Sequence, residues 1–160
     1  MSANSGSTPG SEPFAHLLRY GLARAIQAHS DELRARHPQA ALDLDLVDDE
    51  GLMEWAAYHA LYRVYLEAMA NILRDEDALQ SRPVRVHYAP IGNTMCLEIR
   101  SSEQAFSIVD DWSRFQRGGL GVMGMKAQLE GMGGALKIAS EPGEDTAISA
   151  SLPLTTTRAE

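Results

Sequence analysis

A glycine-rich turn that leads directly into an apolar helix most constrains what this chain can fold into. Residues 117–134 read RGGLGVMGMKAQLEGMGG, with glycines at 118, 119, 121 and 124. Glycine lets the backbone come close to a phosphate or to another backbone, and the start of a helix offers unpaired N–H groups to an anion. The pattern is typical of a nucleotide-binding loop, but also of a plain connection between two elements. Other motifs must decide between the two.

Hydrophobic periodicity predicts helices interleaved with strands. Two windows have the period of helices: 14–36 and 50–74,. Five runs alternate with the period of strands: 41–46, 84–88, 95–99, 136–138 and 146–154,. A further short amphipathic helix is predicted within 101–117, and the glycine turn continues as a helix through Met132. This order predicts an α+β fold, a two-layer α/β sandwich whose mixed sheet carries its helices on one face.

Composition indicates one globular domain. The chain has 160 residues, of which 44% are apolar and 22% charged,. We expect a polar tail at 1–13, the domain at 14–155 and a second tail at 156–160. The net charge of −8 argues against nucleic acid or an anionic membrane as the main partner,. With one cysteine and no apolar run near the roughly 18 residues of a membrane span, we expect a cytoplasmic protein,.

Glu67 and Asn71 form the second polar motif. They are spaced i and i+4 in the longest predicted helix, so both side chains project from the same surface beside its apolar stripe,. A carboxylate and an amide in this arrangement can orient a water molecule and a metal ion. An exposed polar pair without function is the alternative interpretation.

Three segments together resemble the ATPase domain of histidine kinases, over about residues 18–154. LYRVYLEAMANILR resembles the N-box helix, and RGGLGVMGMKAQLEGMGG followed by ALKIASEPGEDTAISASLPL resembles the glycine box, its helix and the final hairpin,. The variant it is most similar to is the short-lidded type of nitrate-sensing kinases. The resemblance implies the Bergerat-type fold of gyrase and chaperone ATPases, and the function of an ATP-binding domain in a two-component sensor kinase.

The resemblance also implies a set of site residues and partners. Glu67 would be catalytic, and Asn71 would coordinate the Mg²⁺ that bridges the ATP phosphates. The nucleotide-binding residues implied are Asn71, Arg74, Ser102, Gly119, Gly121 and Thr146. The partners implied are a nucleotide and a histidine-containing kinase domain or response regulator, and a homodimer is left open. We expect no phosphoacceptor hairpin in this chain, and hence no autonomous autokinase activity.

Two departures from the family pattern affect the nucleotide pocket. The family has an Asp-x-Gly-x-Gly box whose aspartate accepts a hydrogen bond from the adenine amine, but residues 101–106 here contain neither aspartate nor glycine. Asp75 occupies the position of a family histidine. Losing a hydrogen bond to a charged group, worth about 1.5–3 kcal/mol, predicts nucleotide binding weakened by roughly ten- to a hundredfold. Glu103, or Asp110 and Asp111 in a shifted register, are alternative acceptors.

Two further hypotheses of the function remain, the first of which rests on these departures. One is a degenerate ATPase that acts as a protein-interaction module. The other is a standalone serine kinase of the anti-sigma type, which shares the fold but matches the glycine box less well.

Overall fold

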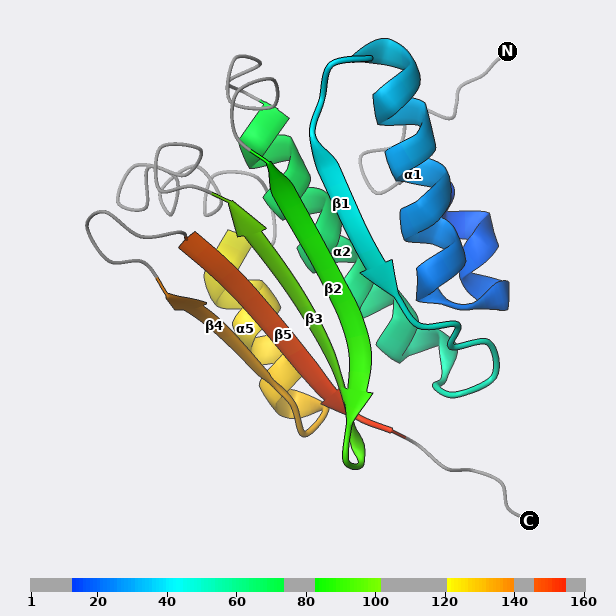
Figure 1. Ribbon diagram of the computed structural model, residues 1–160. Helices are drawn as coiled ribbons and strands as arrows, with labels where there is room; N and C mark the ends of the chain where they lie inside the picture. The colour runs from blue at the N-terminus through cyan, green and yellow to red at the C-terminus, as the bar shows by residue number, and fades with distance from the viewer. Residues whose placement is uncertain (1–12, 74–82, 102–120, 140–145, 155–160) are drawn as a thin grey trace, which may run out of the picture.

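The computed structural model of the chain describes residues 13–73, 83–101, 121–139 and 146–154. Within these ranges a five-stranded sheet carries helices on one face (Figure 1). In chain order the elements are η2 (Ala15–Tyr20), α1 (Leu22–Arg36), β1 (Leu42–Leu46), α2 (Trp55–Leu73), β2 (Val84–Ile91), β3 (Thr94–Ser101), α5 (Gly121–Gly131), β4 (Ala135–Ala139) and β5 (Thr146–Pro153). This is the predicted order; the short helix predicted within 101–117 lies outside the described residues.

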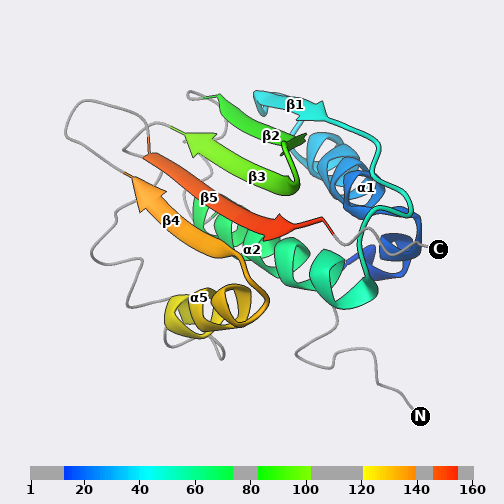
Figure 2. The same cartoon turned by 90° about the horizontal axis from the view of Figure 1, so that it is seen from below.

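The sheet is mixed, with strand order β1-β2-β3-β5-β4. β1 and β2 are parallel, whereas β2 with β3, β3 with β5 and β4 with β5 are antiparallel. Figure 2 shows α1, α2 and α5 together on one side of the sheet. The predicted α+β sandwich with its helices on one face is therefore confirmed.

The core lies between the sheet and the helix layer. Alternate residues of β2 and β3 are buried against the helices: Val84, Val86, Tyr88, Met95, Leu97 and Ile99. The stripe predicted on α2 is buried as well: Ala57, Leu61, Val64, Ala68 and Ile72. Removing a side chain of this size from water contributes about 1.5–3 kcal/mol, so these two apolar sets hold the layers together.

The prediction of one continuous helix over 14–36 is wrong, because the helix is interrupted at Gly21. This glycine has a φ of 107°, which favours glycine, and it separates the 3-10 turn η2 from α1,. A Cβ at Gly21 would lie 2.3 Å from Oδ1 of Asp49. The Asp49 carboxylate accepts the N–H groups of Leu22 (3.1 Å) and Ala23 (3.2 Å), and so caps the start of α1 from 26 to 27 residues away,.

Two further boundaries differ from the prediction. α2 begins at Trp55 and not at residue 50, because residues 49–52 form a turn in which Leu52 N–H donates to Asp49 O. β2 continues through Ile91, three residues beyond the strand predicted over 84–88, so the hairpin loop is only Gly92 and Asn93. No described helix combines the length and the apolar composition that a membrane span needs.

Candidate functional site

Four elements meet at one end of the sheet. β3 ends at Ser101, which pairs with Thr146 at the start of β5. Because β2 and β3 are antiparallel, Ser101 lies beside the start of β2. Figure 1 shows the end of α2 at the same end of the sheet. α5 begins at the same end, as Figure 1 shows. The chain thus brings the end of the predicted N-box helix close to the start of the helix that follows the glycine turn.

Ser101 and Thr146 form a buried hydroxyl pair on the helix side of the sheet. They are 1% and 0% exposed. Ser101 comes two residues after Ile99 and faces the same side of β3, and Thr146 comes two residues before Ile148 and faces the same side of β5,. The Oγ atom of Ser101 has no hydrogen-bond partner among the described residues. A buried hydroxyl without a partner costs free energy, so this atom marks a place where a ligand or water can bind.

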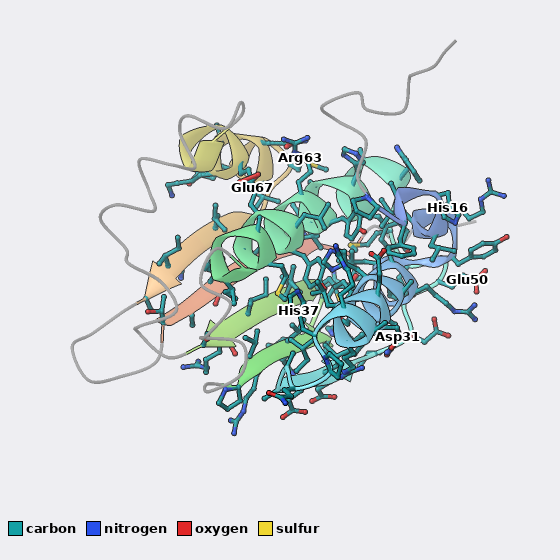
Figure 3. All side chains as sticks on the ribbon, turned by 90° about the horizontal axis from the view of Figure 1, so that it is seen from above. His16, Asp31, His37, Glu50, Arg63 and Glu67 are labelled. Atoms are coloured by element: carbon teal, nitrogen blue, oxygen red, sulfur yellow. The ribbon has the colours of Figure 1, made fainter. Side chains whose placement is uncertain are left out.

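Next to this pair is an apolar pocket between α2, α5 and the sheet. It is lined by Val64, Glu67, Ala68, Met125, Leu136, Ile138 and Ile148. Glu67 is the one ionisable residue in this lining, and Figure 3 shows it projecting from α2 on the side of α5. Ile148 is two residues from Thr146 on the same strand face, about 7 Å along the strand,. Pocket and hydroxyl pair are therefore neighbours.

The chemistry of the pocket suits part of a nucleotide site. Its walls are apolar, as a purine ring requires, and the Glu67 carboxylate is an oxygen group suited to the surroundings of Mg²⁺,. The enclosed space holds about one water molecule, so the pocket in this structure is too small for a purine ring,.

A metal ion would need ligands from elsewhere. No group of three His, Cys, Asp or Glu residues in the described ranges could hold one. A magnesium ion at this site would therefore depend on phosphate oxygens and water for most of its ligands.

The structure describes part of the predicted site. Glu67 lines the pocket and Thr146 is buried beside Ser101. Asn71 lies one turn after Glu67 in α2, and Gly121 is the first residue of α5. The surroundings of the Asn71 side chain and of Gly121 are outside what the structure describes. The remaining predicted residues lie outside the described ranges: Arg74, Ser102 and Gly119.

Sequence reasoning placed Ser101 in the altered segment 101–106 but named Ser102 as the binding residue, and it did not single out the α5 residue Met125. A signal for Ser101 was present, because the alternation of Met95, Leu97 and Ile99 extends to it and places it on the inner face. For Met125 the sequence offered no comparable signal, since its place in the pocket depends on how α5 packs against α2.

No family model matches the chain. The chemotaxis protein CheA of Cereibacter sphaeroides is 26% identical over 153 residues, which cover 90% of this chain and 20% of CheA. The chain thus spans about a fifth of that relative.

Solved structures of histidine kinases share the fold. The blue-light activated histidine kinase EL346 of Erythrobacter litoralis superposes with a TM-score of 0.62 at 14% identity, over 85% of this chain and 42% of that one. The catalytic domain of histidine kinase ThkA superposes with a TM-score of 0.57 at 11% identity, over 82% of this chain and 89% of that domain. The resemblance inferred from the motifs is confirmed in the fold: this chain folds as the catalytic, ATPase-type domain of histidine kinases does.

Proposed function

We propose that the chain is the ATP-binding domain of a two-component sensor histidine kinase, with weakened nucleotide binding and no autonomous autokinase activity. One observation carries the proposal. In this fold, Glu67 lines an apolar pocket between α2, α5 and the sheet, and Thr146, the register partner of Ser101, lies two residues from the lining residue Ile148 on the same face of β5. These residues are far apart in sequence, and a purely structural role would require neither a carboxylate in the pocket nor a buried hydroxyl without a partner among the described residues.

Each residue has a defined task in this proposal. Bound Mg-ATP would supply the phosphoryl group, and Asn71 would hold the metal ion. Glu67 would polarise a water molecule or orient the outer shell of the metal. Gly119 and Gly121 would present main-chain N–H groups to phosphate, while Arg74 would add a positive charge. The phosphoacceptor histidine would come from another domain or chain.

The pocket chemistry supports the expectation of weak binding. No charged residue faces the helices from the described parts of β3 and β5, so a base would meet neutral hydroxyls. Neutral hydrogen bonds contribute about 0.5–1.5 kcal/mol, compared with about 1.5–3 kcal/mol for bonds to charged groups. We therefore expect a dissociation constant for Mg-ATP between about 10 µM and 1 mM.

Calorimetric titration with Mg-ATP tests the proposal. We expect saturable binding that Asn71→Ala abolishes. Asn93→Ala is the matched control, because this exposed asparagine lies in the β2–β3 turn at the opposite end of the sheet and should not affect binding. No heat of binding at several millimolar Mg-ATP would refute the proposal and favour the second candidate, a degenerate ATPase that acts as an interaction module. That candidate is favoured by the narrow space inside the pocket.

A further inference from the structure

Strand β1 forms one edge of the sheet, and its hydrogen bonds to β2 show which of its main-chain groups face outward. Val84 N–H donates to Ala41 O (2.8 Å), and Val47 N–H donates to Tyr88 O (2.9 Å). In a parallel ladder, the residues of one strand alternate between bonding the neighbouring strand and facing away from it. The register between these two bonds assigns the outward-facing main chain of β1 to alternate residues: Leu42, Leu44 and Leu46.

Most of these outward groups have no partner in the part of the chain that the structure describes. Nη2 of Arg34 donates to Leu42 O at 2.9 Å, and so covers the start of the edge from α1. No described residue bonds the main-chain groups of Leu44 or Leu46. Unpaired N–H and C=O groups along an edge are a template for a further strand. The edge from Leu44 to Leu46 can therefore accept an extended segment of another chain through main-chain hydrogen bonds.

An open hollow lies beside this edge, between β1 and α1. Three residues of α1 line it, together with two at the end of β1 and after it: Ala23, Arg24, Gln27, Leu46 and Asp48. No residue of β2 is in this lining, so the hollow is at the rim of the sheet, where Figure 2 shows α1 beneath β1. A strand added to β1 would turn every second side chain toward the helix layer, and so toward the hollow.

The two side chains of β1 on the outer face of the sheet are carboxylates. Asp43 and Asp45 are 70% and 75% exposed, and their ion-pair partners, Arg85 at 3.8 Å and His87 at 2.9 Å, come from β2. If two copies of β1 paired antiparallel through their outward groups, leucine would lie opposite leucine and aspartate opposite aspartate. Like charges directly opposite each other destabilise a strand pair, and opposite charges stabilise it. The edge therefore disfavours a second copy and favours a strand with basic side chains.

We propose that β1 is a docking edge for an extended segment of a partner protein, in which basic residues on the outer face alternate with apolar residues toward α1. The segment pairs with the main chain of Leu44 and Leu46, and its basic side chains lie beside Asp43 and Asp45. One of its apolar side chains enters the hollow. This edge shares no residue with the pocket that Glu67 lines, so docking is independent of nucleotide binding.

An NMR titration of the ¹⁵N-labelled full chain tests the proposal. The probe is a synthetic peptide, blocked at both ends, in which lysine and valine alternate over about seven residues. We expect saturable shift changes at the amides of Leu44 and Leu46, with a dissociation constant below about 1 mM. The same peptide with glutamate in place of lysine should bind at least about tenfold more weakly, because its carboxylates would lie beside those of β1.

Variants of Asp45 test the charge preference. Asp45→Lys should weaken the lysine peptide by at least about fivefold, and Asp45→Asn, which removes the charge at nearly the same size, by about two- to fivefold. Glu130→Lys is the matched control, because it makes the same change of charge as Asp45→Lys on the exposed surface of α5. It should leave the affinity for the peptide unchanged.

Four results would overturn the proposal. The first is the absence of saturable changes at about 5 mM lysine peptide, and the second is equal affinity for the lysine and glutamate peptides. The third is a set of changes centred on β4, the other edge of the sheet. The fourth is a dimer of the chain alone in sedimentation, if Asp45→Lys alters its dissociation constant, because a second copy would then occupy the edge.

Discussion

Asp49 should be among the most important polar residues for the stability of this domain. Its side chain is completely buried and accepts hydrogen bonds from the main-chain N–H groups of Leu22 and Ala23 and from the Tyr88 hydroxyl. Its own carbonyl oxygen accepts the Tyr58 hydroxyl. One residue thus joins the start of α1, strand β2 and the start of α2.

The size of the effect follows from these contacts. Asp49→Ala removes the acceptor for three buried donors, and each hydrogen bond contributes about 1 kcal/mol net. The loss is partly offset because a buried carboxylate is no longer desolvated. We expect a loss of about 2–4 kcal/mol in the free energy of unfolding, near the upper part of the range for single substitutions. Asp49→Asn keeps one acceptor oxygen and should lose about 1–2 kcal/mol.

Urea denaturation followed by circular dichroism at pH 7 measures this loss. Asp48→Ala is the matched control, because Asp48 is exposed and, within the described ranges, its carboxylate accepts just the N–H of Glu50, at 3.3 Å. That control should change stability by less than about 0.5 kcal/mol. If Asp49→Ala and Asp48→Ala have the same stability, the capping role assigned to Asp49 is wrong.

The pH dependence gives a second check on Asp49. Burial raises the pKa of this carboxyl above 3.8, although its hydrogen bonds from Tyr88, Ala23 and Leu22 act in the opposite direction. A raised pKa means that the folded chain binds the proton more tightly than the unfolded chain, so ionisation of Asp49 lowers stability as the pH rises above about 3.8,. The stability advantage of the wild type over Asp49→Asn should therefore narrow from acidic to neutral pH.

Two further predictions concern the helix layer and its connection to the sheet. Gly134→Ala should lower the free energy of unfolding by more than about 3 kcal/mol, since its Cβ would lie 1.9 Å from the Ser151 carbonyl oxygen,. Gly131→Ala is the control: its Cβ meets no atom within 4 Å, so the free energy of unfolding in the same urea assay should stay unchanged or rise by up to about 1 kcal/mol,. Burial lowers the pKa of His29, whose Nδ1 atom is 2.8 Å from the Tyr65 hydroxyl. The wild type should therefore lose stability relative to His29→Gln as the pH falls below about 6.5,. Equal dependence of stability on pH in the two proteins would contradict the lowered pKa.

The regular elements could be predicted because their patterns are local. The stripe on α2 and the alternation in β2 and β3 identify both the element and its buried face within a few residues. The interruption at Gly21 could not be predicted in this way. Its physical cause is the contact with Asp49, which approaches from far along the chain.

The site was predictable where a motif and a periodic element coincide. Glu67 was predicted from its spacing on a strongly periodic helix and from the resemblance, and Thr146 from the resemblance; the structure places Glu67 in the pocket lining and buries Thr146, and their roles in ligand binding remain predictions. The inward position of Ser101 follows from the local alternation of β3, but its pairing with Thr146 needed the register between β3 and β5, which no local pattern contains. Asn71, Arg74, Ser102, Gly119 and Gly121 remain predictions as ligand-binding residues.

An NMR titration of the ¹⁵N-labelled chain with Mg-ATP tests the central claim most directly, because it locates the binding site as well as detecting it. We predict chemical-shift changes at Ser101, Thr146, Glu67 and Gly121, with Asp45 on the edge strand and Asn93 in the far turn unchanged. A specific site should have a dissociation constant below about 5 mM, so the absence of any change at that concentration of Mg-ATP would contradict the claim. Changes centred on the outer face of the sheet would contradict it equally.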